Sequence, residues 1–156
     1  YVISESPEGY LQSTNSTIKN NLKTWLNHYR MINDTIDILD PYIINIGVEF
    51  IVRPQQGVDK YKTLNSSTRA LEKYFQDKMY IGEQLSISDL YAKLKEVKGV
   101  LDVVSVKVVN KMGINYSNVE LNINQNTSPD GAYIITPKNA ILEVKFPTAD
   151  IKGKIR

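Results

Sequence analysis

The chain has 156 residues, 19 basic and 17 acidic side chains, a net charge of +2 and no cysteine. Hydrophobic residues make up 42% and charged residues 23%, a balance typical of a globular domain rather than a disordered chain. The near-neutral charge argues against nucleic-acid or membrane partners. The lack of cysteine excludes disulfides and thiolate chemistry, and no apolar run approaches the roughly 20 residues of a membrane span.

The first predicted element is a helix that follows a polar lead-in. Residues 1–16 contain Pro7 and Gly9 and are predicted to be loose. Ser16 or Thr17 can cap the helix, since either hydroxyl can accept a backbone hydrogen bond there. Apolar residues then recur at helical spacing, which predicts one face packed against a core or a partner. They are Ile18, Leu22, Trp25, Leu26 and Tyr29.

The clearest predicted strand lies beyond Asp40-Pro41. Residues 31–39 fit a helix and a strand equally, and proline disfavours the helical region for the residue before it. After this break one face is continuously apolar, with Ile44, Ile46, Val48, Phe50 and Val52. The other face is more polar but carries Ile43 and Ile51. This period-2 pattern indicates a strand with one buried face, ended by Pro54.

Two helices are predicted next. The first spans about 65–79 and is followed by Gly82. The second begins at a capping box, in which Ser86 caps the helix and Asp89 reaches back. It is predicted to end at Gly99, where a left-handed residue is favoured. The two apolar stripes are Leu64, Thr68, Leu71, Phe75 and Met79, and Ile87, Leu90, Tyr91, Leu94 and Val97.

Three further strands are predicted over residues 100–109, 119–124 and 141–146. In the first of them Val104, Val106 and Val108 are expected to share one face. A turn is predicted at 128–131, since Ser-Pro-Asp-Gly is a strong turn sequence. Pro147 is expected to close the last strand. The final residues, with Lys152, Lys154 and Arg156, are expected to form an exposed tail.

The element order predicts an α+β fold, with an antiparallel or mixed β-sheet, two helices packed on one face and a preceding N-terminal helix. The strands on either side of the two helices are expected to pair antiparallel, and later strands to add by hairpins. The one-sided pattern over 44–52 favours helices on a single face. We predict an N-terminal lead-in and helical arm over 1–40 and an α+β domain over 41–156.

No catalytic, cofactor or metal site is predicted. His28 is the single histidine, so a serine–histidine–acid arrangement is not supported. Asp34, Asp37 and Asp40 recur every three residues and could hold a hard cation weakly on a helix, but we prefer roles in surface solvation or turn capping. Ten tyrosines are unusual. Five near element ends or in loops suggest recognition, although tyrosine is also common in sheets: Tyr42, Tyr61, Tyr80, Tyr116 and Tyr133.

Three groups of motifs carry a family resemblance. The first group is LKTWL at 22–26, YRMIND at 29–34 and YIINIGV at 42–48. The second group is IGE at 81–83, LSISDLY at 85–91 and VKGVLDV at 97–103. The third group is SPDG at 128–131, ILEVKFP at 141–147 and DIKG at 150–153. The second group resembles the baseplate J-like family of contractile tails. The first and third resemble its longer version, the baseplate wedge protein of T-even-type bacteriophages.

This resemblance implies a structural role in the virion. Proteins of this family self-associate, join neighbouring wedges into a ring around the tail hub and contact other wedge proteins. The ring rearranges when the sheath contracts, and no catalytic residues are implied. The chain is short for a complete wedge protein and would be its C-terminal portion, as the tail-like final residues suggest, and it would be assembled in the host cytoplasm. Trp25, Ile43 and Ile51 are the expected interface residues.

Two other classes of function stay open on the sequence. A small α+β binding domain for nucleic acid could display aromatic side chains to single-stranded RNA, but the paired aromatic residues are missing. A domain that binds or converts another small ligand needs a pocket with converging polar groups. With one histidine and no cysteine, we favour the enzyme least.

Overall fold

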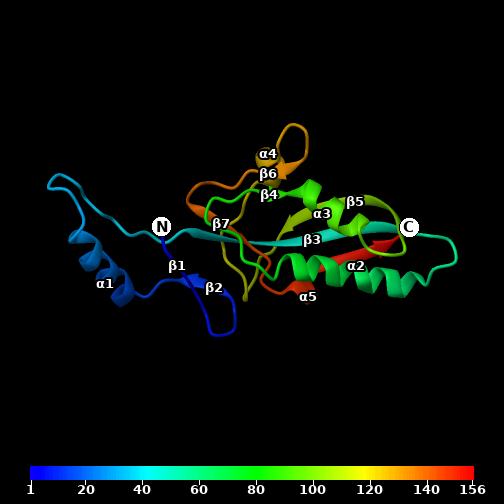
Figure 1. Ribbon diagram of the computed structural model, residues 1–156, viewed down its shortest axis with the longest axis horizontal. Helices are drawn as coiled ribbons and strands as arrows, with labels where there is room; N and C mark the ends of the chain where they lie inside the picture. The colour runs from blue at the N-terminus through cyan, green and yellow to red at the C-terminus, as the bar shows by residue number, and fades with distance from the viewer.

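The computed structural model describes residues 1–156 and has the predicted α+β architecture. Its centre is a mixed four-stranded sheet built around one long strand, β3, which pairs with all three other strands. Figure 1 shows β3 along the long axis of an elongated molecule. The four strands are β3 (Tyr42–Pro54), β5 (Val100–Asn110), β7 (Ala140–Glu143) and β8 (Ile151–Ile155).

The predicted antiparallel pair is confirmed, because β3 and β5 run antiparallel. β7 and β8 instead lie parallel to β3, one after the other, on the edge opposite β5. The short helix α5 (Pro147–Asp150) separates them. The prediction that later strands add by hairpins is therefore wrong. Residues 111–139 carry the chain back to the start of β3, so the next strand runs in the same direction as β3.

The predicted exposed tail is also wrong, since residues 151–155 form β8. Ile151 lies opposite Val48 and is buried, whereas Lys152 and Lys154 are exposed. Charged side chains on an edge strand discourage pairing with other chains. The same charges made this strand resemble a tail in the sequence.

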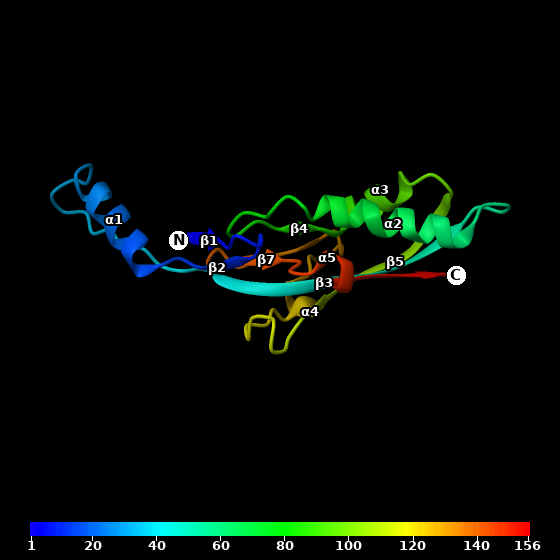
Figure 2. The ribbon, with the colours of Figure 1, turned by 90° about the horizontal axis from the view of Figure 1, so that it is seen from below.

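Two helices cover one face of the sheet, as Figure 2 shows from the side. They are α2 (Lys60–Tyr74), which contacts β8, and α3 (Ile87–Lys95), which contacts β5. The predicted apolar face of β3 lies beneath them and forms the centre of the core, each residue at most 2% exposed. The predicted alternation holds over residues 48–53, but residues 44–48 are buried on both faces, so the prediction of a wetter second face is wrong there. The residues after β5 cover that face: the Ser117 amide donates a hydrogen bond to Asn45, and Lys111 lies against Gly47.

α2 begins and ends earlier than predicted. The Asp59 carboxylate caps it by accepting hydrogen bonds from the amides of Tyr61 and Lys62. Thr63 and Ser67 are buried on its inner face, and each hydroxyl donates to a carbonyl one turn back. Such bonds allow hydroxyl residues on a packed helix face. An apolar stripe alone therefore placed the helix too late in the chain.

The start of α3 is as predicted. The Ser86 hydroxyl accepts a hydrogen bond of 3.1 Å from the Asp89 amide, which is the first half of the capping box. Gly99 has a φ of +97°, and a Cβ there would lie 3.0 Å from Thr63 Oγ1. Glycine is needed here both for the left-handed backbone and for the close approach of α2.

The second strand, β5, is confirmed, but its buried face changes partway. Ile51 lies opposite Ser105 and Val52 opposite Val103, so Val104 is an extra residue in β5. This β-bulge places Val103 in the core instead of Val104. A bulge shifts the alternation by one residue, and the valine-rich sequence gave no sign of it.

The strand predicted over 119–124 does not form. Its residues lie in a loop and in the start of the short helix α4 (Ile123–Asn126). The loop is fixed because Leu121 is buried and its carbonyl accepts a hydrogen bond of 2.7 Å from the Asn110 side chain. The turn at 128–131 is confirmed by a 2.8 Å bond from the Gly131 amide to the Ser128 carbonyl. It leads into β6 (Tyr133–Ile134), which pairs with β4 (Leu85–Ser86).

The N-terminal residues form a hairpin followed by a projecting helix. The hairpin consists of β1 (Ile3–Glu5) and β2 (Leu11–Ser13), so the loose lead-in is a wrong prediction. α1 (Ser16–Asn27) is confirmed, but its cap is Asn15, whose side chain accepts from the Thr17 amide. Residues 31–41 have no helix or strand. None of the helices is both long and apolar enough to cross a membrane.

Candidate functional site

Exposed apolar side chains gather on α1 and the segment that follows it, residues 16–40, which we call the α1 arm. Figures 1 and 2 both show the arm extending from one end of the molecule. No residue of α1 is buried. The arm holds six of the sixteen exposed large hydrophobic side chains of the protein. They are Ile18, Trp25, Tyr29, Met31, Ile32 and Leu39.

The predicted apolar stripe of α1 is therefore only partly covered: Leu22 and Leu26 are half-buried, whereas Ile18, Trp25 and Tyr29 are exposed. Trp25 is 57% and Tyr29 is 73% exposed, and their rings contact one another with centroids 4.9 Å apart. Beyond the helix, Met31 is 77% and Ile32 99% exposed. An apolar cluster of this kind on a protein surface marks an interaction site.

Four of the six charged side chains of the arm form ion pairs within it. Lys19 forms an ion pair with Asp40, and Lys23 one of 3.2 Å with Asp37. The Asp40 carboxylate also accepts a 3.2 Å hydrogen bond from the Thr14 amide. The hydrogen bond from Lys19 lowers the pKa of Asp40 below its ordinary value, against the opposing effect of burial. These contacts hold α1 against the segment that follows it, which contains Asp37 and Asp40.

A buried carboxylate attaches the N-terminal hairpin to the sheet. Glu143, at the end of β7, is 4% exposed and accepts hydrogen bonds of 2.8 Å from the Leu11 amide and 2.9 Å from the Asn45 side chain. Lys78 Nζ lies 3.7 Å from the same carboxylate. Tyr10 packs edge-on against Phe146. Buried carboxylates are tolerated when paired in this way.

A second buried carboxylate holds the loop after β5. Asp150, 1% exposed, accepts hydrogen bonds of 2.7 Å from the Tyr116 hydroxyl and 3.0 Å from the Phe146 amide. Lys111 Nζ lies 3.7 Å away. Burial, together with the hydrogen bond to Asp150 and its negative charge, raises the pKa of Tyr116 to about 12. Glu143 and Asp150 therefore each have two hydrogen-bond donors and one lysine as partners within the protein.

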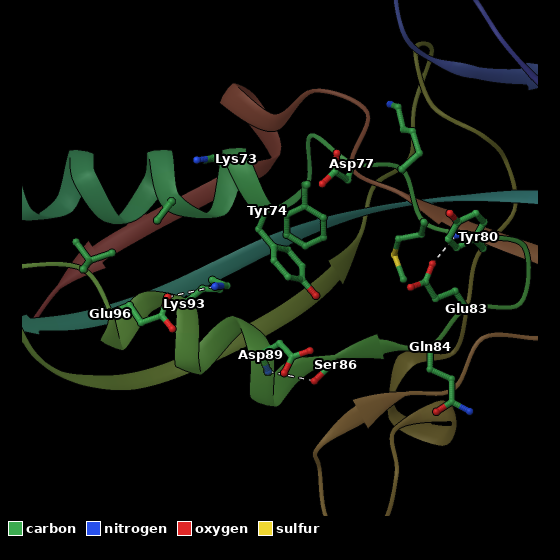
Figure 3. Close-up of a pocket in the computed structure, with 15 residues that line it drawn as sticks. Lys73, Tyr74, Asp77, Tyr80, Glu83, Gln84, Ser86, Asp89, Lys93 and Glu96 are labelled. Carbon is green, nitrogen blue, oxygen red and sulfur yellow. Dashed lines mark hydrogen bonds and ion pairs between the residues drawn. The ribbon is translucent and has the colours of Figure 1, made fainter.

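The main groove of the protein opens between the end of α2 and the start of α3 (Figure 3). We call it the α2–α3 groove, and its volume is about 1030 Å³. The Tyr74 ring projects into it, and Asp77, Glu83 and Asp89 lie around its edge. Burial raises the pKa of Tyr74, and the charges of Asp89 and Glu83 raise it further.

The predicted interface residues do not come together. Trp25 lies on the arm, while Ile43 and Ile51 lie on β3 and are partly buried. They are eight positions apart on one strand, which separates them by roughly 26 Å at the usual rise. Ile43 lines a small hollow with Leu11 and Tyr116.

The other residues considered in the sequence have ordinary surroundings. His28 caps the end of α1 and is exposed. Asp34, Asp37 and Asp40 lie in an extended segment, so the helix face that they would have shared does not exist. No cluster of three potential metal-binding side chains occurs. Tyr80 lines the α2–α3 groove, and Tyr116 bonds to Asp150.

Sequence reasoning missed the groove and both buried carboxylates. Glu143 stands among apolar residues and Asp150 shortly after Pro147, which gives little local sign that either is buried, and their hydrogen-bond partners are distant in sequence.

No protein-family model matches the chain, and a search of curated proteins finds no significant match.

Proposed function

We propose that the protein is a non-enzymatic assembly module whose α1 arm is the main contact surface. The exposed apolar side chains of α1, Ile18, Trp25 and Tyr29, are the single observation that carries this proposal. A helix of 12 residues is marginal in water by itself. Its apolar face gains stability only when another surface covers it.

The family resemblance suggests the assembly in which this surface would act. A wedge protein of a contractile tail baseplate joins its neighbours into a ring around the hub, and a projecting apolar arm suits that task. On this proposal the chain self-associates and contacts other wedge proteins of the virion. Trp25 is the predicted interface residue that lies on the arm, and Ile51 on the open face of β3 is a second contact candidate.

The size of the arm surface agrees with a stable contact. Six exposed apolar side chains of this kind, at on the order of 100 Å² each, provide about 600 Å² per copy, as expected from the areas that large side chains bury. With an equal area buried on the partner surface, the total approaches the lower limit of about 1,200 Å² for specific interfaces.

The test is the solution mass of the full chain, measured by light scattering over a wide concentration range. We expect an oligomer that persists on dilution, and we expect Tyr29→Glu to shift it toward the monomer. Tyr61→Glu is the matched control, because Tyr61 is 79% exposed on α2, away from the arm. A monomer at all concentrations, or equal effects of the two variants, would contradict the proposal.

A small α+β binding domain is the second candidate, and the α2–α3 groove is the observation that favours it. Ligand pockets commonly measure about 300–1,000 Å³ and combine apolar walls with a few polar groups. Nucleic acid is the weaker form of this candidate, since salt-dependent oligonucleotide binding needs cationic surface and the groove edge is acidic.

A further inference from the structure

The turn at the end of α1 has a distinct chemistry. Residues 28–33, the arm tip, combine three exposed apolar side chains with one cation, and the adjoining residue, Asp34, carries an exposed carboxylate. The apolar side chains are Tyr29, Met31 and Ile32. The cation is Arg30, which donates one hydrogen bond of 2.8 Å to the Asp34 carbonyl. A guanidinium has five N–H donors, so most of them stay free for another partner.

The α2–α3 groove has the complementary chemistry. Its wall includes Tyr74, Phe75 and Met79, which offer an aromatic and thioether surface. Three carboxylates at its edge, the acidic rim, form no ion pair: Asp77, Glu83 and Asp89.

The lysines of the groove offset little of this charge. Lys93 pairs with Glu96 at 3.2 Å, and Lys78 is directed to the buried Glu143. Only Lys73 opposes the three rim carboxylates without an ion pair of its own. The groove therefore presents a net negative field over an apolar wall, which suits an apolar segment that carries one cation.

These two surfaces lie apart within one chain. In both ribbon views the arm extends from one end of the molecule, while α2 and α3 cover the body of the sheet. The N-terminal hairpin, bonded to Glu143, lies between them and anchors the base of the arm. The arm tip of one copy can therefore meet such a groove only on another copy.

We propose that the arm tip of one copy inserts into the α2–α3 groove of a second copy, with Arg30 facing the acidic rim. This inference rests on the proposed function and names the partner of its contact surface. Met31 and Ile32 pack against the groove wall, and the Arg30 guanidinium pairs with rim carboxylates or lies over the Tyr74 ring. The contact joins two different surfaces, so it closes reciprocally in a pair or continues around a ring.

The absence of native cysteine makes the contact directly testable by disulfide trapping. An Ile32→Cys chain is mixed with a Tyr80→Cys chain of different length, oxidised, and analysed by mass. Tyr80 lines the groove and is 79% exposed. Tyr61→Cys replaces it as the matched control, with the same 79% exposure outside the groove. Ile114→Cys replaces Ile32→Cys, as an equally exposed apolar position on another loop.

We expect the mixed product of Ile32→Cys and Tyr80→Cys to exceed both control pairs at least tenfold. A second measurement uses charge: Arg30→Glu and Asp77→Lys should each weaken self-association, and a mixture of the two variant chains should associate better than either alone. Circular dichroism confirms that both variants are folded.

The outcomes separate this inference from the proposed function. If Ile32→Cys chains join mainly to one another, the arm pairs with an arm; the assembly role stands and the groove contact is overturned. Trapping at the level of the controls also overturns the groove contact. If Tyr29→Glu leaves the solution mass unchanged, the arm is not the contact surface and both proposals fail.

Discussion

The α1 arm and the helices α2 and α3 of the body share the same sequence pattern but differ in whether their apolar side chains are buried. α1, α2 and α3 each have an apolar stripe at helical spacing. α2 and α3 bury theirs, with Leu71, Leu90 and Leu94 at 0% exposure, whereas α1 buries none. The comparison teaches that periodicity defines the face of a helix that needs covering, but not which molecule covers it.

The physical difference is in what holds each helix. α2 and α3 gain stability from burial against the sheet, which is worth about 1.5–3 kcal/mol for each large apolar side chain. α1 is held by the half-buried Leu22 and Leu26 and by two lysine–aspartate pairs, of which Lys23–Asp37 is exposed and Lys19–Asp40 is partly buried. Exposed ion pairs of this kind contribute about 0–1 kcal/mol each, so the arm is stable mainly if something packs on it.

The largest expected effect comes from comparing the same leucine-to-alanine substitution in α3 and in α1. Leu90→Ala in α3 should lower the free energy of unfolding by about 2–5 kcal/mol, the usual cost of a cavity in a core. Leu26→Ala in α1, where the leucine is only half-buried, should lower it by less than about 1 kcal/mol. Urea unfolding of the monomer at low concentration measures both. Equal losses would mean that the arm is part of the core.

A smaller effect tests how the base of the arm is attached. Glu143→Ala leaves the Leu11 amide and the Asn45 side chain without their acceptor, which should cost about 1–3 kcal/mol. Hydrogen exchange should then show faster exchange in the β1–β2 hairpin than in β3 and β5. Glu8→Ala, on an exposed hairpin residue, is the control. Unchanged protection of the hairpin would show that Tyr10 and its neighbours hold it without the carboxylate.

The smallest expected effect separates the body from the arm by pH. Tyr116 donates its hydroxyl proton to Asp150 only while it is neutral, and its pKa is raised to about 12. Its contribution, about 1 kcal/mol for one hydrogen bond, is present below the ordinary tyrosine pKa of about 10. It is lost as the pH rises through 12. The pKa of Tyr74 is also raised, so tyrosinate absorbance should show late-titrating tyrosines, and Tyr116→Phe should remove the one with a pKa of about 12.

The arm responds at the other end of the pH scale. The pKa of Asp40 is lowered, so its pair with Lys19 stabilises the folded arm above the ordinary aspartate pKa of about 3.9 and is lost in acid. NMR titration of α1 amide signals follows this change. A body that loosens in acid before the arm does would contradict the assignment of these two groups to separate regions.

Much of the body followed from local patterns. The apolar face over 44–52, the Ser86 cap and the Ser-Pro-Asp-Gly turn are short-range signals, and each is present in the structure, although the second face of the strand is also buried over 44–48. The errors lie where a distant contact decides. The strand over 119–124 is missing because Leu121 packs into a loop anchored by Asn110, and β8 exists because β3 offers it a free edge.

The candidate site divides in the same way. The apolar stripe with Trp25 and Tyr29 is visible in the sequence, and so is the small number of reactive side chains. The α2–α3 groove, the unpaired acidic rim and the buried Glu143 depend on which elements lie side by side. The spacing of residues along the chain therefore does not predict the groove, the acidic rim or the burial of Glu143.

The sequence by itself determined the fold class, the long central strand and the amphipathic character of all three main helices. These features depend on backbone propensity and on periodic burial, which act over a few residues. Tertiary structure alone decided the strand order, the bulge at Val104 and the exposure of the α1 stripe. Those depend on which distant surfaces meet and how much apolar area each contact removes from water, and that is a property of the whole folded chain.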